Sequence, residues 1–209
     1  MNEQISTIKS WLGTGSINIF GLPMSGKDTQ GIMLAEALGA KFISSGAIIR
    51  TNEAATGRNL TADGQTTPTD IFYELVLPYF ERQDLWNFPL VLSSIGRWSG
   101  EENQVMSVAE GAGHPIKAAI SLNISEKSAM ERWEAARILG DRGSRPDDMT
   151  PEIFQRRINE YKEKTLPVLK HYDELGLLIQ IPAEAPRETV FSDLISRLSA
   201  FKTTGVTTP

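Results

Sequence analysis

The residues best suited to chemistry form one short stretch, Gly21-Leu-Pro-Met-Ser-Gly-Lys-Asp-Thr-Gln30. Glycines let consecutive backbone N–H groups turn toward one anion, and the start of a following helix adds a partial positive charge there. Lys27 would supply a full charge at the β- and γ-phosphates of a nucleotide. The stretch meets the pattern Gly-x-x-x-x-Gly-Lys-[Ser/Thr] through Lys27 and departs from it at Asp28. It predicts a phosphate-binding loop; the alternative is a glycine turn with a solvated lysine.

Arginines recur along the rest of the chain, at Arg50, Arg97, Arg132, Arg137, Arg142, Arg145, Arg156 and Arg157. Each one alone is expected to be a solvated surface charge. Together they suit phosphoryl transfer, which needs positioned positive charge around the moving group more than covalent chemistry from the protein. The planar guanidinium group pairs with phosphate through two hydrogen bonds and stays charged.

The composition narrows the class of protein. With 209 residues, 40% of them hydrophobic and 22% charged, the chain can form one domain with a substantial core. The net charge of −5 argues against a general nucleic-acid binder. The chain has no cysteine, which excludes disulfides and thiolate metal sites, and its two histidines are far apart. We find no membrane-length apolar run and no secretory signal, so we expect a cytoplasmic protein.

Short apolar runs alternate with amphipathic segments. The predicted strands are 17–20, 41–43, 89–92, 118–124 and 177–181. The predicted helices are 2–12, one that contains 32–38, a helix opened by the turn 44–50, 71–78, 100–112, 126 to about 139, one starting at 151, and 190–201. The expected caps are Thr69 or Asp70, Ser125 and Thr150, and Gly39 is an expected stop. Pro167 should kink or break its helix. Residues 51–70 are polar, which favours a mobile excursion.

This alternation predicts an α/β fold, in which a five-stranded parallel sheet lies between two layers of helices. Ligands of such sheets bind at the carboxyl ends of the strands. The glycine loop, the turn after residue 43 and the segment Ser93–Arg97 all follow strands, so we expect them to gather at one edge.

Over about residues 16–200 the chain resembles the adenylate kinases, within the wider nucleoside monophosphate kinase family. Gly21–Gln30 is similar to the family's G-x-P-G-x-G-K-G-T-Q, and Phe42–Arg50 to its I-S-T-G-D-x-x-R. The other similar segments are Gly64–Pro68, the arginine at 97, Arg132, Arg145–Asp148, and the stretch from Arg157 through Thr165-Leu-Pro167 to Tyr172.

The resemblance implies the reaction Mg·ATP + AMP ⇌ 2 ADP, with Mg²⁺ as cofactor and ATP and AMP as partners. The implied catalytic residues are Lys27, Arg97, Arg132, Arg145 and Arg157. The implied ATP-binding residues are Gly21, Met24, Ser25, Gly26, Lys27, Asp28, Thr29 and Arg132. The implied AMP-binding residues are Ser45, Arg50, Thr66, Thr67, Ser94, Arg97, Glu101 and Gln104. Thr29 and Asp28 are the candidates at the metal, mostly through water.

The resemblance also implies a domain plan. The core would comprise 1–43, 74–136 and 150–202, with a monophosphate-binding segment at 44–73, a short lid at 137–149 and a flexible tail at 203–209. The lid has no Cys or His set, so no structural zinc is expected there. Family analogy suggests a monomer.

The chain departs from the family at several positions. Met24 and Asp28 replace glycines of the loop, and Ser93 replaces the acid that orders the waters of the magnesium ion. Glu101 stands at the place of the base-reading glutamine, with Gln104 three residues further on. Either Asp28 supplies the oxygen that position 93 has lost, or the metal site has decayed and the protein binds nucleotides with little turnover. A kinase for UMP, CMP or another monophosphate stays open, as does a nucleotide-binding regulatory protein.

Overall fold

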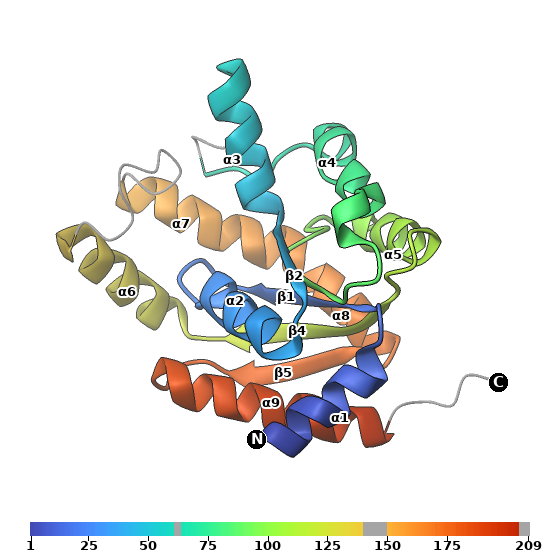
Figure 1. Cartoon of the computed structure of the whole chain (residues 1–209). Helices are drawn as coiled ribbons and strands as arrows, with labels where there is room; N and C mark the ends of the chain where they lie inside the picture. Colours follow the sequence, from blue (N-terminus) through green and yellow to red (C-terminus); the bar gives the residue numbers. More distant parts are fainter. Residues whose placement is uncertain (61–63, 140–149, 205–209) are drawn as a thin grey trace.

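A computed structural model describes residues 1–60, 64–139 and 150–204 of the chain. Within these ranges five strands form a single parallel sheet in the order β2-β3-β1-β4-β5 (Figure 1). Their bounds are β1 Ser16–Gly21, β2 Lys41–Ser44, β3 Leu90–Ser93, β4 Ile116–Asn123 and β5 Leu178–Pro182. The predicted fold class, an α/β protein with a parallel sheet between two helical layers, is confirmed.

The helices follow the predicted pattern, with small shifts at their ends. They are α1 Asn2–Leu12, α2 Lys27–Leu38, α3 Ser45–Thr56, α4 Thr69–Leu75, α5 Glu101–Gly111, α6 Glu126–Leu139, α7 Pro151–Glu160, α8 Leu166–Glu174 and α9 Arg187–Thr204. Two 3-10 turns, Leu77–Glu81 and Gln83–Leu85, lead from α4 toward β3, and a π-helical segment, Tyr161–Thr165, joins α7 to α8. None of the described helices is long and apolar enough to cross a membrane.

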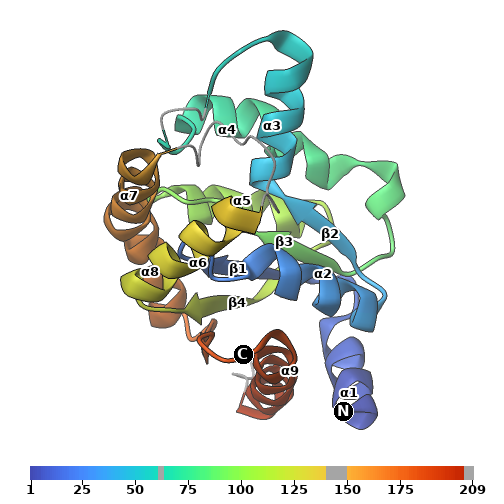
Figure 2. The ribbon, with the colours of Figure 1, turned by 90° about the vertical axis from the view of Figure 1, so that its left-hand side faces the viewer.

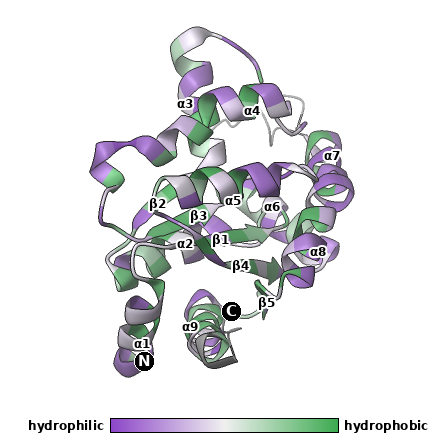
Figure 3. Cartoon of the chain, turned by 90° about the vertical axis from the view of Figure 1, so that its right-hand side faces the viewer, coloured by the Kyte–Doolittle hydropathy of each residue, from purple (hydrophilic) through white to green (hydrophobic). Residues whose placement is uncertain are grey.

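Alternation along the strands divides the core between the two faces of the sheet. Ile17 and Ile19 of β1 pack with α1, α2 and α9, whereas Phe20 packs with α4, α5 and α8. Successive side chains of a strand point to opposite faces, so a strand covered on both sides is apolar throughout. Figure 2 shows α1 and α9 on one side of the sheet, and Figure 3 shows mostly hydrophobic strands surrounded by helices that carry both hydrophobic and hydrophilic residues.

A third, smaller core joins α6 to α7. Trp133 and Phe154 stack with their ring centroids 5.2 Å apart and an interplanar angle of 18°, and Leu22, Ala129 and Ile158 complete the cluster. Leu22 comes from the glycine loop, so this core fixes the two helices against the segment that is expected to bind phosphate.

Most of the predicted helix ends are confirmed. Gly39 ends α2 in the left-handed conformation, and the Thr150 hydroxyl accepts a hydrogen bond from the Ile153 amide at 3.3 Å. The Ser125 hydroxyl likewise accepts from the Ser128 amide at 3.1 Å.

The predicted cap of α4 was wrong. Pro68 is the N-cap residue, and neither Thr69 nor Asp70 caps the helix through its side chain. The Thr69 hydroxyl instead donates a 2.7 Å hydrogen bond to Oε1 of Glu101, because α4 packs beside the buried start of α5.

The predicted kink or break at Pro167 is confirmed in part, because α7 ends at Glu160 and α8 begins at Leu166. Pro167 lies in the first turn of α8, where a missing backbone N–H costs little, and the chain stays helical through it. The irregularity lies just upstream, in the π-helical segment Tyr161–Thr165.

Two further boundaries differ from the sequence prediction. Residues 51–56 of the predicted excursion complete α3, and α9 extends to Thr204, into the predicted tail. The predicted lid, 137–149, lies for the most part outside the described residues. Its first residues, 137–139, are the last residues of α6.

Candidate functional site

The segments that follow β1, β2 and β3 meet at one edge of the sheet, as predicted. Ile19 of β1 and Ser44 of β2 are both in register with Ser93, the last residue of β3. Because the strands are parallel, the loops after their carboxyl ends surround one space.

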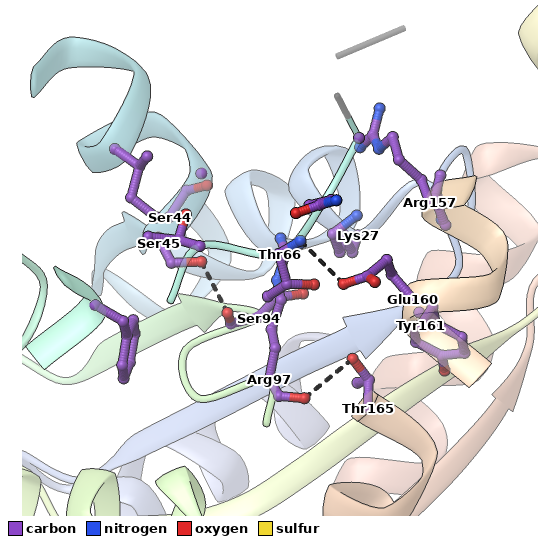
Figure 4. Close-up of a pocket in the computed structure, with 18 of the residues that line it drawn as sticks. Lys27, Ser44, Ser45, Thr66, Ser94, Arg97, Arg157, Glu160, Tyr161 and Thr165 are labelled. Atoms are coloured by element: carbon purple, nitrogen blue, oxygen red, sulfur yellow. Dashed lines mark hydrogen bonds between the residues drawn. The ribbon is translucent and has the colours of Figure 1, made fainter. Parts of the chain in front are cut away.

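That space is a cavity that is partly open to solvent. Four cationic side chains from four different elements line it: Lys27, Arg50, Arg97 and Arg157. In Figure 4, Lys27, Arg97 and Arg157 lie around the same opening. The predicted residues Gly21, Asp28, Ser45, Thr66, Thr67, Ser94 and Glu101 line it as well.

The glycine loop has the geometry of an anion cradle. Gly26 is the N-cap of α2 with a φ of 86°, a left-handed angle that favours glycine. A side chain on Gly21 would lie 2.9 Å from the carbonyl oxygen of Leu122 and would collide with the Ser25 hydroxyl. That hydroxyl is buried and has no hydrogen-bond partner among the described residues.

Met24 adopts a left-handed backbone angle with a φ of 67°, where a residue other than glycine is strained. The side chain leaves the loop and packs against the α6–α7 core. Met24 therefore does not line the cavity, although its backbone remains part of the loop.

Gly46 and Ser45, at the start of α3, help to position Arg50. A side chain on Gly46 would lie 2.9 Å from Nη1 of Arg50, so this glycine leaves room for the guanidinium group. The Ser45 hydroxyl donates a 2.8 Å hydrogen bond to the carbonyl oxygen of Ser94, which ties the start of α3 to the segment after β3 (Figure 4).

The loop that carries Arg97 is fixed from three sides. Asn18, buried in β1, donates to the Ile95 carbonyl at 2.7 Å and accepts from the Ile95 amide at 3.2 Å. The carboxylate of Glu101 accepts from the backbone amide of Arg97 at 2.8 Å, and Thr165 donates to the Arg97 carbonyl at 3.3 Å. Arg97 is thus held by its backbone, and its side chain lines the cavity.

Helix α7 closes the opposite side of the cavity. Gly64 lies so close to α7 that a side chain on it would approach the Ile153 carbonyl to 2.8 Å. Glu160 accepts a 3.0 Å hydrogen bond from the Thr66 amide and forms an ion pair with Lys164, in which Nζ lies 2.6 Å from Oε2. Burial alone would raise the pKa of Glu160, but Lys164 and Thr66 lower it below its ordinary value of 4.5.

Asp28 is a carboxylate among the cations. Its Oδ1 accepts a 2.5 Å hydrogen bond from the Ser93 hydroxyl. Burial alone would raise the pKa of Asp28. Lys27, the hydrogen bond from Ser93, Arg97 and Arg50 outweigh burial, so the pKa lies below its ordinary value of 3.8 and the side chain is ionised at neutral pH.

Several predicted residues lie outside the cavity. Arg132 donates hydrogen bonds to the carbonyl oxygens of Met24, Ala183 and Glu184, at 3.2, 2.8 and 3.2 Å, so it braces the glycine loop against the segment before α9. Gln104 is exposed on α5. The other predicted residues that do not line the cavity are Ser25, Gly26 and Thr29. Arg145 lies outside the described residues.

Other cavity residues were not predicted as site residues, among them Ile49, Phe72, Glu160, Tyr161 and Thr165. The apolar and aromatic side chains of Ile49, Phe72 and Tyr161 suggest core positions when only the sequence is known. Glu160 reads as an ordinary helix-surface charge. The signal that could have found Glu160 and Tyr161 is their position three and four residues after Arg157, which places them on the same face of a helix.

A parallel α/β sheet with a glycine loop between its central strand β1 and α2, and a cation-lined cavity at the carboxyl edge, defines a candidate phosphate-binding protein of the P-loop class. No protein-family model matches the chain. It is 27% identical over 184 residues to the adenylate kinase of Brucella ovis, covering 84% of this chain and 94% of that protein. It is 29% identical over 182 residues to the adenylate kinase of Rhizobium meliloti, covering 83% of this chain and 94% of that protein. These similarities support a kinase of the adenylate kinase family.

Proposed function

We propose that this protein is a nucleoside monophosphate kinase that transfers the γ-phosphoryl group of ATP to AMP. The observation that carries the proposal is the convergence of Lys27, Arg50, Arg97 and Arg157 on one cavity beside the glycine loop. The names of the curated relatives favour ATP and AMP as the two substrates.

The donor nucleotide would bind at the glycine loop. The backbone amides around residue 24, the start of α2 and Lys27 would hold its β- and γ-phosphates. Arg132 would act on the donor side by holding the carbonyl of Met24 and so fixing the shape of the loop.

The acceptor would bind between α3, α4 and the loop after β3. Arg50 and Arg97 would hold its phosphate, and Ile49 and Phe72 would offer an apolar surface to its base. A monophosphate oxygen is already ionised at neutral pH, so this scheme needs no general base. Ser45 and Ser94 would keep the two acceptor-side segments together.

Transfer requires positive charge where the phosphoryl group moves between the two oxygens. Arg157 approaches the cavity from α7, facing Lys27 and Arg97 from the other side (Figure 4). Arg145, in the proposed lid, would add a further charge on closure. The core would comprise 1–43, 74–136 and 150–202, and closure of 44–73 and 137–149 would exclude water.

Mg²⁺ would enter with ATP. The described residues contain no cluster of three or more His, Asp or Glu side chains able to hold a metal. Mg²⁺ bound with a nucleotide takes one or two protein carboxylates, phosphate oxygens and waters, and Asp28 at the loop fits this requirement. When bound, the ion would neutralise charge on the phosphates.

Two positions, Glu101 and Gln104, were expected to read the base of the acceptor. The carboxylate of Glu101 already accepts hydrogen bonds from the Arg97 and Trp98 amides and the Thr69 hydroxyl, and Gln104 is exposed outside the cavity. A kinase for UMP or CMP is therefore the second candidate function.

A coupled assay of ADP formation tests the proposal, with ATP as donor and AMP, UMP, CMP, GMP and their deoxy forms as acceptors. We expect the highest kcat/KM with AMP. The highest value with UMP or CMP would instead establish the second candidate. ATP binding without transfer to any monophosphate would overturn the kinase proposal and leave a nucleotide-binding regulatory protein.

A further inference from the structure

Asp28 differs from the other carboxylates that line the cavity. Glu101 accepts three hydrogen bonds from protein groups, and Glu160 is occupied by the Thr66 amide and the Lys164 ammonium group. Both therefore have protein partners that explain their burial. Within the described part of the chain, Asp28 accepts a hydrogen bond from the neutral hydroxyl of Ser93, and the cations around it act on it through charge.

The position of Asp28 would make it unfavourable for a bare polyphosphate. It is the second residue of α2, directly after Lys27, at the helix start that would face the donor phosphates. A negative charge at this point repels the phosphate oxygens, and in a partly buried site the repulsion is poorly screened. A divalent cation between the carboxylate and the phosphates would turn this repulsion into attraction.

Ser93 fixes the direction of the carboxylate. It is the last residue of β3, is 1% exposed, and is in register with β1 and β2, so its hydroxyl is held by the sheet. A hydroxyl donor uses one acceptor site of the carboxylate and leaves its charge in place. A carboxylate has about four acceptor sites, so most of its capacity remains for a cation or for the waters of a cation.

We propose that Asp28, positioned by Ser93, makes nucleotide binding by this protein dependent on a divalent cation. This inference rests on the proposed function, since it assumes that ATP binds at the glycine loop. It assigns to the Asp28–Ser93 pair the task of receiving the cation that accompanies the triphosphate.

The test is calorimetric titration with ATP, in Mg²⁺ and in EDTA, of the wild type and Asp28→Asn. The amide oxygen of Asn can still accept from Ser93, so the variant changes the charge and preserves the shape. For the wild type we expect Mg²⁺ to strengthen ATP binding by about tenfold or more. We expect Asp28→Asn to bind ATP more tightly than the wild type in EDTA and more weakly than the wild type in Mg²⁺. The two affinities of the variant, in Mg²⁺ and in EDTA, should therefore lie within about threefold of each other.

The ratio of the two affinities separates this inference from a simpler role for Asp28. If Asp28 only neutralises Lys27 and the arginines, the variant will bind ATP more tightly by the same factor with and without Mg²⁺. An unchanged ratio would overturn the inference. Asp173→Asn, on the exposed end of α8 and outside the cavity, is the matched control and should leave both affinities as in the wild type.

A second variant tests the pair. The double variant Asp28→Ser with Ser93→Asp exchanges the two residues. It places a carboxylate at position 93 and a hydroxyl at position 28, so the pair is kept with its two groups interchanged. We expect the exchange to restore at least part of the Mg²⁺ dependence that Asp28→Ser alone has lost, and no restoration would contradict the assignment to the pair.

If the folded wild type binds no ATP in either buffer, the proposed function fails. If it binds ATP with the same affinity in both buffers, only the present inference fails.

Discussion

Met24 keeps a left-handed backbone angle that glycine would adopt without strain. The side chain compensates by packing against the α6–α7 core, beside Trp133 and Phe154. Met24 therefore combines a strained backbone with a stabilising side-chain contact. Two substitutions can separate these two effects.

Met24→Ala and Met24→Gly remove the same packing, but only glycine relieves the backbone angle. We expect Met24→Gly to be more stable than Met24→Ala by about 1 kcal/mol. Urea unfolding of the three proteins measures the difference. A glycine variant that is less stable than the alanine variant would show that the backbone at residue 24 is not strained.

Glu160 predicts a pH dependence of stability. Its pKa is lowered in the folded protein, so its contribution is present above the ordinary value of 4.5 and is lost as the pH falls through the folded-state pKa. Glu160→Gln should cost about 1 kcal/mol at neutral pH, and the difference from the wild type should shrink as the pH falls below the ordinary pKa of a glutamate. Urea midpoints across this range test it, and a constant difference would contradict it.

At the scale of elements, the turn from β1 into α2 depends on a glycine at its first position. A side chain on Gly21 would meet Ser25 and the Leu122 carbonyl of β4. Gly21→Ala should therefore destabilise the protein by about 1–3 kcal/mol, as overpacked sites do, and weaken ATP binding. Gly111→Ala is the control, because no atom lies within 4 Å of its added methyl group. Equal effects of the two substitutions on ATP affinity would contradict the fitted turn.

Periodicity and end signals were sufficient to predict the five strands and most helices, because these signals are local. The strand order was not predicted, since nothing in residues 41–44 or 90–93 encodes which strand lies next to β1. The π-helical segment at 161–165 was missed for a similar reason, since the sequence drew attention to Pro167 and the irregularity precedes it.

The glycine spacing marks Lys27 in the sequence, whereas Arg50, Arg97 and Arg157 were singled out among the arginines by the resemblance to the adenylate kinases. Arg132 shows the limit of that reasoning. An arginine that would bind phosphate and one that holds backbone carbonyls look alike in a sequence, and only the fold brings Ala183 and Glu184 to its guanidinium group.

At the scale of the whole molecule, α7 brings Arg157 to a cavity whose other walls come from β1, α3 and the loop after β3. Removing one preorganised charge at a developing negative centre lowers turnover by about 10²-fold or more. We expect this loss in kcat for Arg157→Ala, with nucleotide affinity changed far less. Arg156→Ala, the adjacent arginine outside the cavity, is the control. Near-full turnover of Arg157→Ala would refute the proposed role of Arg157.

The central proposition is that the glycine loop and the arginines act on one continuous polyphosphate. Titration with two adenosines joined by five phosphates tests it directly, because this compound would span the donor and acceptor positions at once. We expect one molecule bound per chain, about 10²-fold or more tighter than ATP, since linking two binding groups makes the second contact intramolecular. Binding no tighter than that of ATP would contradict a shared donor and acceptor cavity.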